Sequence, residues 1–200
     1  MQGSIPRKFG SITLSERLHI FGTALCLPFI LAWSLMTKPF VSRHAKKHWK
    51  RVVIETAIQT VTGAFNRVQL QYLFGDSTQR NIEKWAKRVK VPIEVEEIGE
   101  NAKLTWMGQK RTDRVIFYFH GGAFLMPLQE PSLDFWKYIQ RELKRRGQDV
   151  TFVVLQYTLV PNAVFPTPLQ QAVRALEHLQ TCGIQPQNLQ LAGDSAGGNL

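Results

Sequence analysis

The chain has 200 residues, of which 44% are hydrophobic, and it carries a formal net charge of +10 at pH 7. This length and apolar content suffice to bury a core. Two cysteines, Cys26 and Cys182, do not make a disulfide framework or a metal site, so both are predicted to be free thiols. Residues 1–51 hold nine lysines and arginines against one glutamate, so the basic excess is confined to this region and no nucleic-acid partner is expected.

The amino-terminal region, residues 1–45, contains an uncharged apolar segment, Ile20–Met36. Its 17 residues reach the lower limit for a membrane-spanning helix, and Pro28 lies in the middle. A spanning anchor, an interfacial helix, a cleaved signal peptide and a buried cap helix are the alternatives. Bulky residues follow the segment where a cleavage site would need small ones. We therefore favour a membrane anchor or an interfacial helix.

Residues 46–90 are predicted to form a helical, cap-like region. Apolar residues return at intervals of three and four over Lys46–Phe74, which indicates one helix that ends at the Gly75-Asp76 pair. A second helix is expected over Ser77–Lys90, with Ser77 as its cap. The residues that share its apolar face are Ile82, Trp85 and Val89.

Two segments that alternate apolar and polar residues, Ile93–Gly99 and Lys103–Gly108, predict a β-hairpin that turns at Glu100-Asn101. Acidic residues gather there, namely Glu94, Glu96, Glu97 and Glu100. We interpret them as a solvated strand face and not as a metal site, because no histidine accompanies them in the sequence.

Residues 91–200 are predicted to form an α/β domain. Strands and helices alternate in the order Val115–Phe119, Leu133–Arg146, Thr151–Gln156, Thr167–Cys182 and Leu189–Ala192. The last of these helices is expected to bury Leu169, Val173, Leu176 and Leu179. This is the order that a doubly wound parallel sheet requires, so we predict such a sheet.

A glycine pair follows the predicted strand Val115–Phe119, in the sequence His120-Gly121-Gly122-Ala123. Glycines at the carboxyl end of a buried strand let backbone N–H groups approach a ligand closely. Fixed N–H donors of this kind form an oxyanion hole, which stabilises the tetrahedral intermediate of acyl transfer. His120 is expected to hold this loop by hydrogen bonds.

The run from Gly193 to Gly198 contains the pattern G-x-S-x-G, that of a nucleophile elbow. After a strand, this sharp turn presents a serine hydroxyl at the top of the sheet, and small residues permit the turn. We therefore expect Ser195 to be the catalytic nucleophile and Asp194 to brace the turn. The expected oxyanion donors are the amides of Gly121, Gly122 and Ala196. The residues expected to support the turn and the loop are Gly193, Gly197, His120 and Ala123.

These motifs, together with the segment Tyr157–Pro166, resemble the hormone-sensitive lipase group of α/β-hydrolases, which includes the arylacetamide deacetylases and fungal sterol-acetate deacetylases. The resemblance covers 114–200 well and 91–109 loosely. Ala123 replaces the third glycine usual in that group, which is tolerable because the oxyanion donors are backbone groups. Val160 and Asn162 replace the usual alanine and glutamate.

The resemblance implies an α/β-hydrolase fold, with a mostly parallel sheet and flanking helices, and a serine esterase that acts on a small lipophilic ester without a metal or a cofactor. In this group the triad order is serine, acid, histidine. None of the five histidines is a credible general base, namely His19, His44, His48, His120 and His178. We therefore interpret the chain as the front part of a longer enzyme, truncated after the elbow and inactive alone.

Two other interpretations remain open: a glycine-rich turn in an unrelated α/β protein, and a non-catalytic or truncated relative that acts as a binding protein.

The resemblance also implies helices that cover the pocket. Their aromatic residues either line an acyl site or pack in a core, and we favour the core; they are Trp49, Phe65, Tyr72 and Trp85. It implies the endoplasmic reticulum membrane, with the enzyme facing the lumen. The lysines and arginines that follow Met36 instead favour the cytosolic side, so the orientation stays open.

Overall fold

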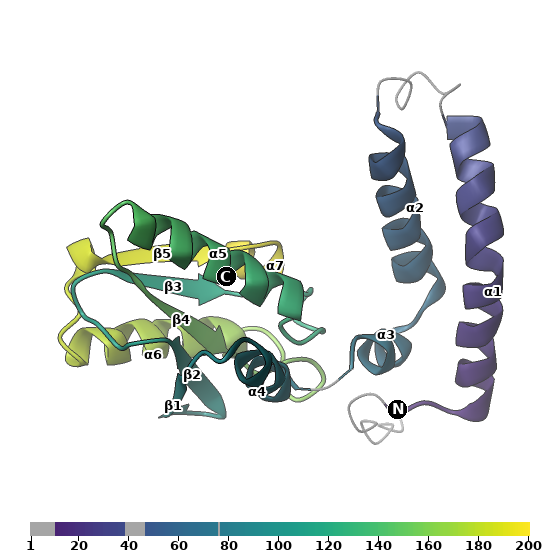
Figure 1. The fold of residues 1–200 in the computed structure, drawn as a ribbon. Helices are drawn as coiled ribbons and strands as arrows, with labels where there is room; N and C mark the ends of the chain where they lie inside the picture. Colours follow the sequence, from purple (N-terminus) through teal and green to yellow (C-terminus); the bar gives the residue numbers. More distant parts are fainter. Residues whose placement is uncertain (1–10, 39–46, 76) are drawn as a thin grey trace, which may run out of the picture. The chain divides into compact units, whose positions relative to one another are not determined.

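The computed structural model describes residues 11–38, 47–75 and 77–200. The chain divides into two compact units, with the boundary between Phe74 and Gly75 (Figure 1). His44, the predicted helix start at Lys46, and Asp76 lie outside the described residues.

The first unit begins with a long apolar helix, α1 (Leu14–Thr37). A reciprocal capping box starts it, because the Thr13 side chain accepts a hydrogen bond from the Glu16 amide and the Glu16 carboxylate accepts one from the Thr13 amide. Its 24 residues would extend about 36 Å at the helical rise. In the described part of the chain, α1 alone is long and apolar enough to cross a membrane, although buried core helices and signal sequences pass the same test.

Two further helices, α2 (Trp49–Ala64) and α3 (Arg67–Phe74), replace the single helix expected over this region. The break lies at Asn66, whose side chain accepts a hydrogen bond from the Gln69 amide at 2.9 Å. The Gln69 side chain accepts one in return from the Asn66 amide at 3.0 Å. The prediction of one helix was therefore wrong, because this pair of bonds caps a new helix at Asn66.

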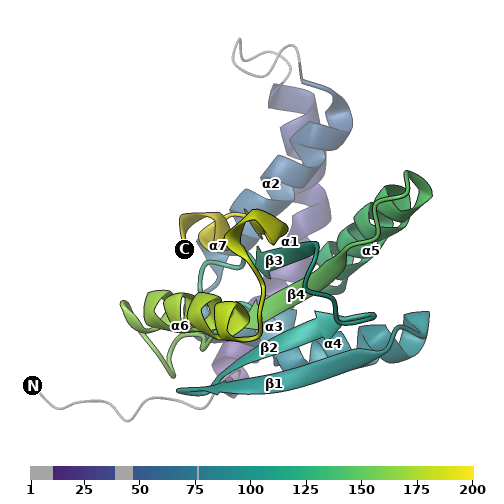
Figure 2. The same cartoon turned by 90° about the vertical axis from the view of Figure 1, so that its left-hand side faces the viewer.

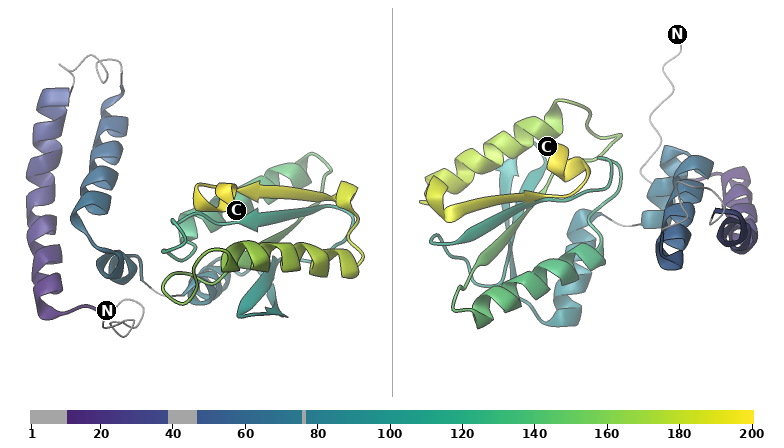
Figure 3. Two further views of the ribbon diagram at one scale, coloured as in Figure 1. Left: turned by 180° about the vertical axis from the view of Figure 1, so that it is seen from behind. Right: turned by 90° about the horizontal axis from the view of Figure 1, so that it is seen from above.

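Helices α1 and α2 lie side by side in both views of the first unit (Figures 1 and 3). Ser34 and Thr56 share a buried hydrogen bond of 2.8 Å between their hydroxyl oxygens. The Lys38 ammonium donates to the Thr56 hydroxyl at 2.7 Å. Polar side chains thus join two helices whose other surfaces are largely apolar and exposed, as at Trp33 and Ile58.

The second unit begins with α4 (Thr78–Val89), which Ser77 caps as predicted. Trp85 on this helix is fully buried, and its indole N–H donates to Asp134 at 2.8 Å. Helix α4 packs into the α/β core, and the division between the two compact units lies before this helix. Trp85 is accordingly a core residue.

Five strands form one mixed sheet in the order β1-β2-β4-β3-β5, which Figure 1 labels in full and Figure 2 shows from the side for β1 to β4. Their bounds are β1 Ile93–Gly99, β2 Ala102–Met107, β3 Val115–Phe119, β4 Thr151–Gln156 and β5 Leu189–Gly193. The predicted hairpin is confirmed, since β1 and β2 pair antiparallel around the turn. β2 also pairs antiparallel with β4, whereas β3 pairs parallel with both β4 and β5.

Helices cover both faces of the sheet (Figure 3). α5 (Glu130–Arg145) packs with α4 on one face, and α6 (Thr167–Thr181) packs on the other. The predicted apolar face of α6 is partly wrong, because Leu169 and Val173 are 40% and 48% exposed. A different set of residues faces the sheet, and the buried positions of the helix are Pro168, Gln171, Ala172, Ala175 and Leu179.

Candidate active site

The two predicted motifs follow neighbouring strands and leave the sheet at the same end. Strands β3 and β5 are parallel neighbours, with Phe119 paired to Gly193 at their carboxyl ends. The glycine-rich loop therefore starts beside the predicted elbow, and the Asp194 amide reaches the Phe119 carbonyl at 3.4 Å. The helix that follows β3 and the helix that precedes β5 lie on opposite faces of the sheet. Open α/β sheets bind ligands at such a point, beyond the carboxyl ends of the strands.

Ser195 occupies a backbone conformation that residues with a side chain rarely adopt, with φ 50° and ψ −116°. It lies between β5 and the short helix α7 (Ala196–Asn199), and it is exposed. The Gly197 amide donates to the Asp194 carbonyl at 2.9 Å and closes the turn. A positive φ at a non-glycine residue is costly and is typical of functional sites.

The turn is possible because its neighbours have no side chains. A Cβ atom on Gly193 would collide with the Gly197 carbonyl, and one on Gly197 would collide with the Phe119 carbonyl. Both obstacles are backbone atoms, which cannot swing aside as the end of a long side chain can. The tight packing of the elbow on β3 thus requires glycine at both positions.

Asp194 ties the elbow to the glycine-rich loop. Its Oδ1 accepts hydrogen bonds from the Gly121 amide at 2.9 Å and from the Tyr118 hydroxyl. Burial and the adjacent carboxylate raise the pKa of Tyr118, so the hydroxyl stays protonated and donates. This differs from the expectation for Gly121, because the amide assigned to the oxyanion hole is already bound to Asp194.

Gly122 holds the bend of the loop. Its φ is +118°, and a Cβ atom there would lie 2.6 Å from the Met126 carbonyl oxygen. Its own carbonyl accepts bonds from the Leu125 and Met126 amides at 2.9 and 2.8 Å. Ala123 follows with φ 55°, a value that favours glycine. Across the described ranges, the amides of Gly122 and Ala196 have no hydrogen-bond partner.

His120 is fully buried, and the contacts of its ring and carbonyl hold the glycine-rich loop in place. Its ring stacks on Tyr157, with 4.4 Å between ring centroids, and its Nδ1 lies 2.7 Å from the Gly121 carbonyl oxygen. The Tyr157 hydroxyl donates to the His120 carbonyl at 2.6 Å. Burial lowers the pKa of His120 to about 4, so the imidazole is neutral at pH 7. A neutral ring with this bond donates from Nδ1, which gives it a structural role.

No general base contacts the candidate nucleophile within the part of the chain that the structure describes. The Ser195 hydroxyl has no hydrogen bond to any described side chain. His19 and His48 belong to the first unit, and His178 lies near the end of α6. A cavity of about 630 Å³ lies between β5 and α5, but Asp194 and not Ser195 contributes to its wall.

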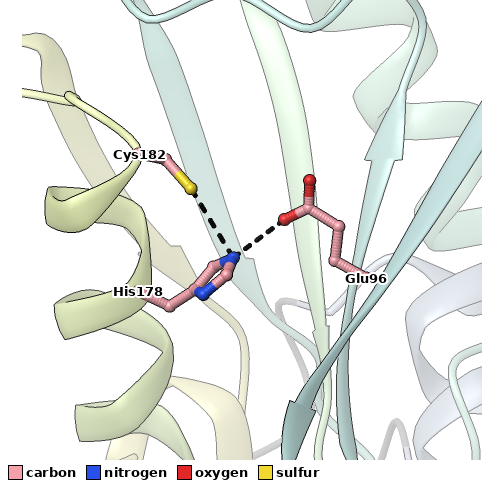
Figure 4. Close-up of side chains that lie close together, drawn as sticks. All are labelled: Glu96, His178 and Cys182. Carbon is pink, nitrogen blue, oxygen red and sulfur yellow. Dashed lines mark hydrogen bonds and ion pairs between the residues drawn. The ribbon is translucent and has the colours of Figure 1, made fainter.

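A second cluster was missed by the sequence analysis, which found no histidine beside the acidic hairpin. His178 Nε2 lies 2.9 Å from Glu96 Oε2, and Cys182 Sγ lies 3.6 Å from the same nitrogen (Figure 4). The reason given against a metal site was therefore wrong. Burial acts to raise the pKa of Glu96, but hydrogen bonds from Lys110 and His178 outweigh it and hold this pKa below its usual value.

Residues 116–200 match the family described as alpha/beta hydrolase fold. An esterase of Fusarium pseudograminearum is 37% identical over 90 residues, which cover 43% of this chain and 26% of the relative. Hormone-sensitive lipase of Homo sapiens is 29% identical over 139 residues, which cover 66% of this chain and 10% of the relative. Arylacetamide deacetylase of Bos taurus is 31% identical over 99 residues, which cover 46% of this chain and 24% of the relative.

Among solved structures, a mutant of the esterase E40 aligns with a TM-score of 0.47 and 25% identity, over 62% of this chain and 43% of the other. By sequence, residues 116–200 match the α/β-hydrolase family, and this part of the chain is similar to hormone-sensitive lipase and arylacetamide deacetylase. The resemblance stated from the motifs is confirmed. The matched segments amount to 10% to 26% of the length of these three relatives.

Proposed function

We propose that the protein is a serine carboxylic-ester hydrolase that works through an acyl-enzyme. The observation that carries the proposal is the strained conformation of Ser195, next to the loop at the end of the neighbouring strand, where the Gly122 amide has no hydrogen-bond partner among the described residues. Strain of this kind persists only where the surroundings enforce it, and a nucleophile elbow is one such place.

In the proposed reaction the Ser195 hydroxyl oxygen attacks the ester carbonyl carbon, and the carbonyl oxygen becomes an oxyanion. The amides of Gly122 and Ala196 are the donors available to hold it, because the Gly121 amide is bound to Asp194. Removal of one such donor typically costs about 100- to 1000-fold in rate. Collapse of the intermediate expels the alcohol, and water then releases the acid.

The serine proton needs a base, and the described residues place none at Ser195. We propose that a histidine and its acidic partner come from residues outside these 200, as the greater length of the homologues allows. Without a base a serine hydroxyl is a poor nucleophile. The 200-residue chain alone is therefore expected to lack significant esterase activity. A burst of product from an activated ester that Ser195→Ala abolishes would contradict this expectation.

The proposed substrate is a small lipophilic ester. Val164 and Phe165 are 65% and 82% exposed in the loop that follows β4. The Val160 amide joins this loop to the glycine-rich loop by a bond of 2.9 Å to the Phe124 carbonyl. Apolar side chains thus lie on a loop attached to the proposed oxyanion hole, where they favour an apolar acyl or alcohol group.

Helix α1 is proposed to attach the protein to a membrane, that of the endoplasmic reticulum, as an anchor or as an interfacial helix. Its length, its apolar composition and the exposure of its large side chains support this. A glycosylation-site reporter near Gly108 determines the orientation, since only a luminal site is modified. Release of the full-length protein by alkaline carbonate would contradict a spanning anchor.

A fluorophosphonate probe on the full-length protein tests the proposed activity. Labelling is expected in the wild type and in the control Ser132→Ala, and it is expected to disappear in Ser195→Ala. Labelling that survives Ser195→Ala would overturn the assignment of the nucleophile. A full-length protein that is folded but never labelled would favour the alternative of a binding protein.

A further inference from the structure

The cluster of Glu96, His178 and Cys182 is separate from the proposed active site. His178 lies near the end of α6, and Cys182 caps that end. The chain then enters β5 at its amino end, whereas Ser195 follows the carboxyl end of the same strand. Glu96 lies on β1, at the opposite side of the sheet from β5, which leads to Ser195. The proposed esterase chemistry therefore leaves the cluster without a role.

Two side chains converge on one nitrogen atom in this cluster. Glu96 Oε2 and Cys182 Sγ lie 2.9 and 3.6 Å from His178 Nε2, and Figure 4 shows both contacts ending at that atom. A ring nitrogen carries at most one hydrogen, so a single N–H cannot form a good bond with both neighbours. Three possible ligand atoms that lie within 4.8 Å of one another could instead hold a metal ion.

The distances from His178 Nε2 to the other two atoms are close to those of a tetrahedral zinc site. Zinc binds sulfur at about 2.3 Å and nitrogen or oxygen at about 2.0–2.1 Å, so tetrahedral ligands lie about 3.5 Å (N to S) and about 3.3 Å (N to O) apart. The observed separation of 3.6 Å from Nε2 to Sγ already has this value. The Glu96 carboxylate would need to move by less than about 0.5 Å, and all three atoms lie within 4.8 Å of one another.

Local structure supports the same geometry. His178 and Cys182 are four residues apart, so they project from one face of α6 toward β1. Lys110 donates to Glu96 Oε1, and this fixes the carboxylate while Oε2 faces the histidine. Glu94 lies 3.7 Å from the Lys110 ammonium, so a second carboxylate offsets its charge. The His178 side chain is 33% exposed, which leaves a path for an ion from solvent.

We propose that Glu96, His178 and Cys182 bind a zinc ion, with water as the fourth ligand. A thiolate, an imidazole and a carboxylate are the ligands that zinc prefers. Binding releases the thiol proton to solvent and moves the imidazole hydrogen to Nδ1. Because the ligands come from β1 and α6, the ion would fasten the end of that helix to the outer strand of the hairpin. The site is structural and takes no part in ester hydrolysis.

Zinc titration of the reduced chain, followed with a competing chromophoric chelator, tests the proposal, and cobalt replaces zinc as a spectroscopic probe. One ion per chain is expected, with a thiolate-to-cobalt charge-transfer band. Cys182→Ser, His178→Gln and Glu96→Gln should each weaken binding by more than about 100-fold, because loss of an outer-shell partner alone costs about 10- to 100-fold. Cys26→Ser, which removes the exposed cysteine of α1, is the matched control and should bind as the wild type does.

Failure of the wild type to bind zinc with this stoichiometry, or an affinity that Cys182→Ser leaves unchanged, would overturn the proposal. In that case the cluster is an ion pair of His178 and Glu96 beside a free thiol. Cys182→Ser changes one atom at a partly exposed position, so it decides the question even where another variant fails to fold. Zinc should also raise the melting temperature of the wild type and leave that of Cys182→Ser unchanged.

Discussion

Substitution of Ser195 by glycine should stabilise the folded chain while it removes the proposed nucleophile. The backbone angles of φ 50° and ψ −116° lie outside the regions open to a residue with a Cβ atom. Strain of this kind costs about 1–3 kcal/mol. Glycine relieves it but loses about 0.4–1 kcal/mol through the greater freedom of the unfolded chain. The difference predicts a net gain of about 0.5–2 kcal/mol in the free energy of unfolding.

Urea denaturation of the wild type, Ser195→Gly and Ser195→Ala measures this effect. Both variants lack the hydroxyl, but only glycine lacks the Cβ atom, so alanine is the matched control and should retain the strain. The expected order of stability places Ser195→Gly above Ser195→Ala by about 0.5–2 kcal/mol. Equal midpoints for the two variants, or a less stable glycine variant, would refute the argument that the elbow stores strain at this residue.

Three further measurements address the residues around the elbow. The pKa of His120 is about 4 in the folded chain and 6.5 in the unfolded chain. The contribution of neutral His120 to the free energy of unfolding should therefore be fully present above pH 6.5, and about 3 kcal/mol of it should be lost as the pH falls to about 4. Urea midpoints across this range should show a weaker decline in His120→Asn than in the control His48→Asn. Gly197→Ala should lose several kcal/mol of the free energy of unfolding or fail to fold, because the added Cβ atom meets a backbone carbonyl. Gly198→Ala is the control and should behave as the wild type, because a Cβ atom there has only ordinary contacts. Tyr118→Phe should lower the free energy of unfolding by about 1.5–3 kcal/mol, the usual value of a hydrogen bond to a carboxylate. An unchanged urea midpoint would contradict a stabilising role for the bond from Tyr118 to Asp194.

Features that depend on local sequence were predictable. The apolar runs that became β3 and β4 are short and β-branched or aromatic, and Ser77 is a standard helix cap, so periodicity and capping suffice for these elements. The break between α2 and α3 also had a local signal, which the periodicity obscured. Asn66 stands three residues before Gln69, and such a pair indicates a helix start.

Features that depend on tertiary contacts were not predictable in the same way. Glu96 and His178 are 82 residues apart, and only the pairing of the sheet and the packing of α6 bring them together. The elbow and the glycine-rich loop were correctly expected on neighbouring strands. That the Gly121 amide binds Asp194 could not be inferred, because backbone amides carry no signature of their partner. The proposal of Gly122 and Ala196 as oxyanion donors therefore rests on this contact and not on the sequence.

Strand β5 has a partner on one side only, because the described residues place β3 beside it and no strand on its other side. Its outer row of amide and carbonyl groups is a template for another extended chain, and Leu191 beside it is 58% exposed. An isolated 200-residue chain should therefore self-associate through this edge as its concentration rises. Purification would benefit from a lysine at Gln190, since a charge on an edge strand discourages intermolecular pairing.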